Sequence, residues 1–106
     1  MDNLDKIKLV KILSTLPIPV AHVVFAEPQN APYLIYLDEE CENTAANSKT
    51  VNKQSLIQLE LYTKLKQSQE YESVVETLLD DFTTYEKSHS FIAEESLCIT
   101  YYRFYF

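Results

Sequence analysis

The chain contains no glycine in its 106 residues, and this absence restricts its backbone more than any other feature of the sequence. Glycine is the residue that most readily adopts positive φ and lets a ligand approach the backbone closely. Glycine-rich phosphate-binding loops and the glycine-flanked nucleophile elbow of hydrolases are therefore excluded. We expect any tight turn that needs positive φ to fall on Asn or Asp, or to be replaced by a longer loop.

The composition predicts one folded domain over residues 1–106. An apolar fraction of 46% with 12% aromatic residues is typical of a chain with a core.

Sixteen acidic residues against nine basic ones give a formal charge of −7, which is the opposite of the basic footprint of nucleic-acid-binding proteins. Cys41 and Cys98 are too few and too far apart for a disulfide scaffold, so we expect free thiols in a reducing compartment. No apolar run approaches the roughly 20 residues of a membrane span.

Two segments have the periodicity of amphipathic helices. The first ends at Pro17. Its apolar positions are Leu4, Ile7, Val10 and Leu13, widened by Leu9, Ile12 and Leu16, and its lysines are Lys6, Lys8 and Lys11. The second fits the i, i+3, i+4, i+7, i+8, i+11 pattern at Tyr71, Val74, Val75, Leu78, Leu79 and Phe82. Ser68 is the expected N-cap of this second helix.

Five further segments have the residue types of β-strands. They are Val20–Phe25, Tyr33–Leu37, Lys53–Tyr62, Thr84–Ser88 and Ser96–Phe106. The acidic segment Asp38–Asn52 has no periodicity and is predicted to be a loop. The order αβββαββ predicts an α+β fold, in which two helices pack on a mixed, mainly antiparallel β-sheet.

The last strand carries aromatic residues on both of its faces. One face has Tyr102, Phe104 and Phe106, and the other has Tyr101, Arg103 and Tyr105. If both helices cover one face of the sheet, the surplus aromatic residues on the other face indicate a partner. Alternatively, one helix covers each face, or the tyrosines tolerate partial exposure through their hydroxyl groups.

No group of residues predicts a metal site or a catalytic centre. The possible zinc ligands are His22, His89, Cys41 and Cys98, but none has the paired spacing of a zinc motif, and three separate elements would have to converge. The acidic loop lacks the glycine turn of a calcium-binding loop. Ser88 and Ser90 flank His89, but adjacent strand residues point to opposite faces. We therefore expect no metal, no cofactor and no enzymatic activity.

Four segments resemble a family of bacteriophage proteins. They are APYLIYL (31–37), SLIQLELYTK (55–64), LLDDFTTYEKS (78–88) and FIAEESLCITYYRFYF (91–106). They are similar to the tail terminator, or head–tail joining, proteins of long-tailed phages and prophages of Gram-positive bacteria. The similarity extends from about Pro32 to the end of the chain. It lies in the pattern of strand-like and helix-like segments, and it includes no catalytic signature.

The resemblance implies a fold of order αβββαββ and a structural role in the virion. Such proteins form hexameric rings on the end of the tail tube, stop its polymerisation and join the tail to the head. The implied partners are other copies of the chain, the tail tube protein and a head-completion (neck) protein, with DNA only in transit through the ring. The implied location is the head–tail interface of the virion, after assembly in the bacterial cytoplasm, with no membrane and no cofactor.

Under this resemblance, two sets of residues become candidate sites. The acids proposed for the ring lumen or stacking face are Asp38, Glu39, Glu40 and Glu42. Six chains at −7 would carry −42, so an acidic lumen would repel passing DNA instead of trapping it. A ring interface needs two different complementary patches. The candidates for these patches are Lys6, Lys8 and Lys11, the acids Asp80 and Asp81, and the strand residues Tyr101, Arg103 and Tyr105.

The sequence is also compatible with three other functions. The chain is short and lacks glycine, which leaves room for a position one layer higher, in the neck. A small acidic phage inhibitor that mimics DNA is a second alternative, and it would be a monomer or a dimer. An enzyme with a carboxylate-bound metal is the least favoured.

Overall fold

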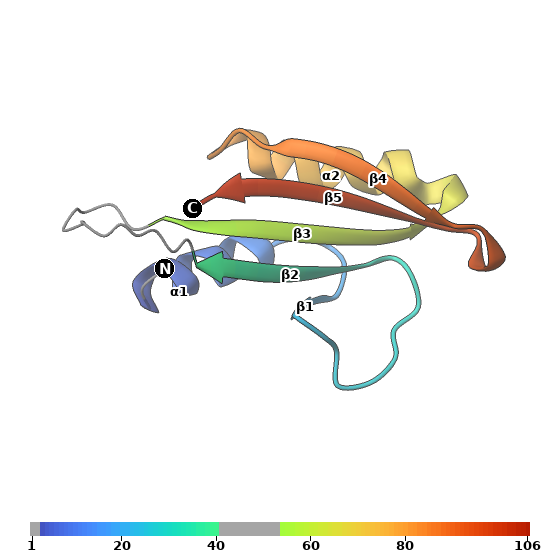
Figure 1. Ribbon diagram of the computed structural model, residues 1–106, viewed down its shortest axis with the longest axis horizontal. Helices are drawn as coiled ribbons and strands as arrows, with labels where there is room; N and C mark the ends of the chain where they lie inside the picture. The colour runs from blue at the N-terminus through green and yellow to red at the C-terminus, as the bar shows by residue number, and fades with distance from the viewer. Residues whose placement is uncertain (1–2, 41–53) are drawn as a thin grey trace.

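The computed structural model describes residues 3–40 and 54–106, which form an α+β fold (Figure 1). The elements are α1 (Asn3–Leu13), β1 (Val20–His22), β2 (Tyr33–Glu40), β3 (Ser55–Lys64), the 3-10 turn η2 (Leu65–Gln67), α2 (Ser68–Asp80), β4 (Glu86–Ile92), the 3-10 turn η3 (Ala93–Glu95) and β5 (Leu97–Tyr105). This order confirms the predicted fold class and the predicted order of helices and strands, αβββαββ.

The five strands form one mixed sheet in the order β1-β2-β3-β5-β4. β1 runs parallel to β2, and the pairs β2–β3, β3–β5 and β4–β5 are antiparallel. The long strands β3 and β5 therefore lie inside the sheet, where their backbone groups are paired on both sides. The short strand β1 and the strand β4 form its edges.

Both helices lie on the same face of the sheet (Figure 1). Side chains of β3 alternate between buried and half-buried from Ser55 to Thr63, as expected when one face packs on a core and the other does not. The buried core consists of Leu9, Leu13, Leu16, Leu34, Ile57, Leu59, Leu61, Val75, Leu79, Tyr102 and Phe104. α1 lies behind the β2 side of the sheet, and α2 lies behind the β4–β5 side.

The helices differ from their predicted faces at four positions. In α1, Ile7 and Val10 are 52% and 45% exposed, because Leu9 and Leu13 form the line that enters the core. In α2, Val74 belongs to the predicted apolar pattern but is 36% exposed, and Glu72, which lies outside that pattern, is buried. The predicted N-cap at Ser68 is wrong: its hydroxyl donates to the Leu65 carbonyl at 3.3 Å, because η2 leads directly into the helix.

The strand boundaries also differ from the predictions. β2 continues to Glu40, so the loop predicted from Asp38 begins too early; residues 38–40 pair with residues 55–57 of β3, and this pairing extends the ladder. β1 ends earlier, at His22. β4 begins later than predicted and includes Ile92, because residues 86–92 pair with β5.

The positive-φ residues of the described ranges are Val23 (φ 70°) and Ser96 (φ 53°), so the prediction that tight turns with positive φ fall on Asn or Asp is wrong. At Val23, the Val24 amide donates to the His22 carbonyl at 2.7 Å, closing a tight three-residue turn. The Val23 amide also donates to the Tyr36 carbonyl at 3.0 Å. A β-branched residue is unfavourable in this region, and these bonds to the sheet hold it there. The Ala31–Pro32 peptide bond is cis.

Candidate functional site

One face of the sheet is not covered by either helix (Figure 1); from the connection before β2, the Phe25 ring meets the Tyr33 ring edge-on, with centroids 5.5 Å apart. The strand positions that alternate with the core point away from both helices, and we call them the open face. Its members on β2, β3 and β5 are Tyr33, Ile35, Leu37, Leu56, Gln58, Glu60, Tyr62, Leu97, Ile99, Tyr101, Arg103 and Tyr105, and on β4 they are Glu86, Ser88, Ser90 and Ile92. Most are half-buried by their neighbours on the sheet, Ile99 is buried, and Tyr105 is 55% exposed.

The centre of the open face is an ordered group of polar and aromatic side chains. The rings of Tyr33 and Tyr62 stack with centroids 4.6 Å apart. The Tyr62 hydroxyl donates to one oxygen of Glu60 at 3.0 Å, and the Gln58 amide donates to the other at 2.9 Å. Burial, and then the hydrogen bond to Glu60, raise the pKa of the Tyr62 hydroxyl. Two hydrogen bonds therefore hold the Glu60 side chain in place on this part of the face.

The structure places the predicted strand residues Tyr101, Arg103 and Tyr105 on the open face. Because both helices lie on the opposite face, the alternative in which one helix covers each face is wrong. The other aromatic residues of the segment pack beneath α2, where the ring of Phe82 meets those of Phe104 and Phe106 edge-on at 5.8 and 5.9 Å.

The predicted charged patches lie at opposite flanks of the sheet. Lys6, Lys8 and Lys11 are exposed on α1, and the Lys6 amine lies 4.0 Å from the Asp38 carboxylate. Asp80 and Asp81 are exposed at the end of α2. Within one chain, therefore, these two patches do not meet (Figure 1).

The predicted acidic set is divided by the fold. Asp38 lies in β2, where its carboxylate accepts a hydrogen bond from His22 Nε2 at 2.9 Å; this bond is the main reason that the pKa of Asp38 is lowered. The His22 ring also stacks on Tyr36 at 4.8 Å. Glu39 and Glu40 end β2, and Glu42 lies outside the described residues.

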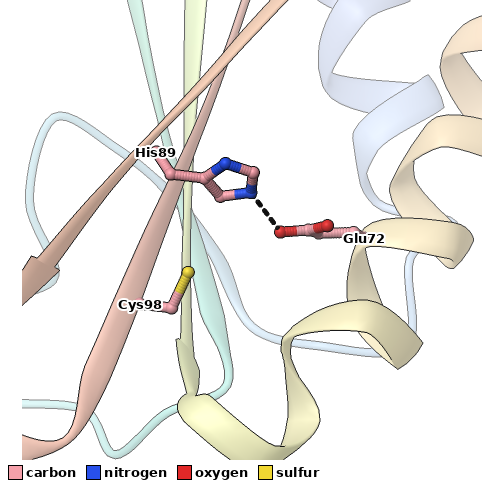
Figure 2. Close-up of side chains that lie close together, drawn as sticks. All are labelled: Glu72, His89 and Cys98. Carbon is pink, nitrogen blue, oxygen red and sulfur yellow. Dashed lines mark hydrogen bonds and ion pairs between the residues drawn. The ribbon is translucent and has the colours of Figure 1, made fainter.

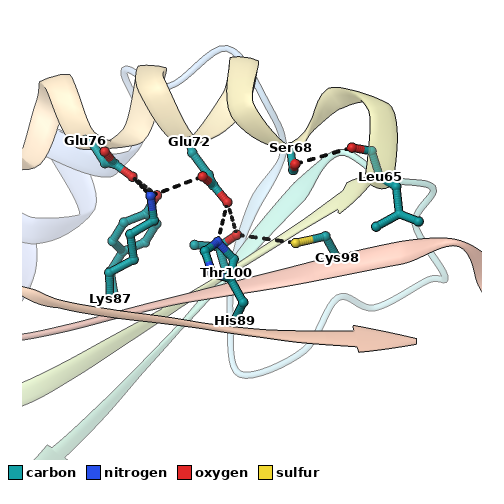
Figure 3. Close-up of polar contacts among 9 residues, drawn as sticks. Leu65, Ser68, Glu72, Glu76, Lys87, His89, Cys98 and Thr100 are labelled. Carbon is teal, nitrogen blue, oxygen red and sulfur yellow. Dashed lines mark hydrogen bonds and ion pairs between the residues drawn. The ribbon is translucent and has the colours of Figure 1, made fainter. Parts of the chain in front are cut away.

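A polar cluster that sequence reasoning missed lies between α2 and the strands β4 and β5 (Figure 3). At its centre, Glu72 is only 8% exposed. One of its oxygens, Oε2, accepts a hydrogen bond from Thr100 at 2.7 Å and lies 2.8 Å from His89 Nε2, and Oε1 lies 3.1 Å from the Lys87 amine. Burial alone would raise the pKa of Glu72, but the bonds from Thr100, His89 and Lys87 outweigh burial and lower it.

The cluster continues to both sides of Glu72. Lys87 also pairs with Glu76 at 2.6 Å, and the same Glu76 oxygen accepts a hydrogen bond from the Tyr102 hydroxyl at 2.8 Å. On the other side, the Cys98 sulfur lies 3.8 Å from the Thr100 hydroxyl. The Glu72 cluster comprises Glu72, Glu76, Lys87, His89, Cys98, Thr100 and Tyr102.

Within the Glu72 cluster, three side chains present metal-binding atoms to one another. A carboxylate oxygen of Glu72, a ring nitrogen of His89 and the sulfur of Cys98 all lie within 4.8 Å (Figure 2). Two of the four residues considered as zinc ligands from the sequence therefore converge. His22 instead pairs with Asp38 near the other edge of the sheet, and Cys41 lies outside the described residues. Glu72 had a detectable signal, because it shares a helix face with Val75 and Leu79.

Comparisons with protein-family models, with curated proteins and with solved structures found no match to this chain. In the part of the chain that the structure describes, no helix is long and apolar enough to cross a bilayer.

Proposed function

We propose that this chain is a structural protein of a long-tailed bacteriophage or prophage, which caps the tail tube, ends its polymerisation and joins tail to head as a ring. Two kinds of evidence support the proposal. The sequence resembles tail terminator proteins over the segments that become β2, β3, the end of α2 with β4, and β5. The order αβββαββ is also the order that the resemblance implies.

The open face is the observation that carries an assembly role. Domains are built from packed layers, and a sheet face rich in apolar and aromatic residues is normally covered. An uncovered face of this kind is typical of a surface that binds another protein. Tyrosine and arginine are enriched at such interfaces, and Tyr101, Arg103 and Tyr105 occupy the β5 part of the open face. This surface supports burial against a neighbouring subunit or the tail tube.

The charged flanks support a ring in particular. A ring that closes on itself repeats one contact between two different patches. α1 presents Lys6, Lys8 and Lys11 at one flank, and α2 ends with Asp80 and Asp81 at the other. In a head-to-tail ring, the basic flank of one subunit would face the acidic flank of the next. Such charge pairing sets register and association rate more than affinity.

Within the proposed ring, we assign the acidic residues at the end of β2 to the lumen or to the stacking face. Reversing the charges of Asp38, Glu39, Glu40 and Glu42 should hinder DNA passage while the ring still forms. Normal infectivity of a phage carrying those changes would count against this assignment. The acids of α2 do not favour a DNA-mimic inhibitor, because Lys87 bridges Glu72 and Glu76 and a mimic needs its carboxylates free.

Electron microscopy of particles made without this protein tests the proposal. The gene for this chain is deleted from the phage or prophage that encodes it, and particle production is induced. Tail lengths and attachment to heads are then measured. Tails of uncontrolled length that fail to join filled heads are the expected result. Tails of normal length beside unjoined heads would move the protein to the neck. Normal virions would overturn a structural role. In that case, a purified chain that stays a monomer or dimer and inhibits a host DNA-binding enzyme would support the DNA-mimic inhibitor instead.

A further inference from the structure

We propose that Glu72, His89 and Cys98 form a zinc-binding site. These residues lie far apart in the sequence, on α2, β4 and β5, and the fold brings their ligand atoms within 4.8 Å of one another. Carboxylate oxygen, imidazole nitrogen and thiolate sulfur are the three ligand types that Zn²⁺ accepts in proteins. The thiolate favours a transition metal such as zinc over Mg²⁺ or Ca²⁺, which prefer oxygen ligands.

The geometry needs only a small adjustment to hold the ion. Zinc–ligand bonds of about 2.0–2.3 Å in a tetrahedron place the ligand atoms about 3.5 Å apart. His89 Nε2 and Glu72 Oε2 are 2.8 Å apart, so this pair opens slightly, and the sulfur approaches by about 1 Å, a rotamer-scale movement. Figure 2 shows the His89 ring directed at Glu72, with the Cys98 sulfur directed into the same space. A water molecule would complete a site with three protein ligands.

The surrounding residues form a shell that orients the ligands. Thr100 donates to Glu72 Oε2 and also contacts the Cys98 sulfur. Lys87 holds Glu72 Oε1, the oxygen that does not contact His89 (Figure 3). Outer partners of this kind fix the orientation of metal ligands and support the affinity of the site.

Charge and access also suit a divalent ion. One carboxylate and one thiolate neutralise Zn²⁺, and Lys87 is balanced by Glu76 at 2.6 Å. Cys98 is 1% exposed and Glu72 is 8% exposed, so the inner ligands are shielded from water. His89 lies on the exposed edge strand β4, and it provides the route of entry from solvent.

The first test uses purified full-length chain with Zn²⁺ or Co²⁺ as the only added metal, under reducing conditions. We expect one ion per chain and, with Co²⁺, the near-ultraviolet charge-transfer band that requires a thiolate ligand. Cys98→Ser should abolish that band. His89→Ala should weaken Zn²⁺ binding at least about 100-fold, since even the loss of an outer partner costs 10–100-fold. Zinc affinity should rise with pH, because the thiol must lose its proton.

Two matched controls separate this site from incidental binding. His22→Ala removes an imidazole that contacts a carboxylate at 2.9 Å, nearly the distance at His89, but its partner Asp38 has no cysteine beside it in the described ranges. Cys41→Ser removes the other thiol. Both variants should bind zinc as the parent chain does. If Cys98→Ser does not fold, the test uses two other variants. These are His89→Ala, at an exposed position, and Glu72→Gln, which replaces the carboxylate with an amide. Absence of the charge-transfer band, or unchanged zinc affinity in both His89→Ala and Glu72→Gln, would overturn the proposal.

Discussion

The two faces of the sheet are made by the same strands, yet they have different environments. On the covered face, Leu59, Leu61 and Tyr102 are completely buried beneath the helices. On the open face, the intervening residues Gln58, Glu60 and Tyr101 remain half-buried. One face of the sheet is therefore packed in the core that stabilises the fold, and the other face is not packed against either helix. Substitutions on the covered face should therefore change stability, and those on the open face should change assembly.

The largest expected difference is between two leucines of β3. Leu59→Ala creates a cavity in the core, and we expect it to lower the free energy of unfolding by about 2–5 kcal/mol. Leu56→Ala, three positions earlier but on the open face, should cost about 1 kcal/mol or less. Urea denaturation followed by circular dichroism measures both. Equal losses would mean that the open face is packed within the single chain, and the contrast between the faces would fail.

A carboxylate on each face gives a second matched pair. Glu72→Ala leaves Thr100 without its acceptor in a buried position, and we expect a loss of about 1–3 kcal/mol in unfolding free energy. Glu60→Ala on the open face removes bonds from Gln58 and Tyr62, which water can replace, so its cost should stay below about 1 kcal/mol. The same denaturation experiment compares them. A larger loss at Glu60 would assign the structural role to the open face instead.

The pH dependence of stability sharpens the comparison at Glu72. Its folded pKa is lowered from the ordinary value of 4.5, so the unfolded chain binds the proton more readily than the folded chain. The corresponding stability is present above the unfolded pKa and is lost as pH falls through the lowered folded pKa. Denaturation at decreasing pH should show this loss in the parent chain and a smaller loss in Glu72→Gln. Identical pH profiles for the two chains would contradict the lowered pKa.

The smallest expected effect on stability is at the exposed rim of the open face. Arg103→Glu and Tyr105→Glu should change the unfolding free energy by about 0.5 kcal/mol or less, as is usual for surface substitutions. Thermal denaturation of the purified variants measures this change. A large destabilisation would show that these residues hold the chain together and are not free for a partner.

The sequence predicted the features that depend on local periodicity. The pattern of Tyr71, Val75 and Leu79 identified α2, and the alternation at Ile57, Leu59 and Leu61 identified β3 and its covered face. Local pattern could not decide that both helices lie on one face, because either helix could pack on either side. The same limit applied to strand ends, since the extension of β2 to Glu40 depends on pairing with β3.

The Glu72 cluster was less accessible to sequence reasoning. Glu72, His89 and Cys98 belong to three elements, and only the register of β4 on β5 and the position of α2 bring them together. The helical pattern could have indicated burial of Glu72, but a carboxylate is normally read as solvent-exposed. Burial of this carboxylate is possible because Thr100, Lys87 and His89 provide its hydrogen bonds.

The most direct test of the central claim is the length of tails made with an altered open face. The phage is supplied with the double variant Arg103→Glu, Tyr105→Glu, or with the control Gln29→Glu in the exposed connection before β2, and tails are measured by electron microscopy. The proposal predicts a folded double variant whose tails are unterminated and unjoined, while the control gives normal virions. Tails of normal length joined to heads in the double variant would contradict the assembly role of the open face.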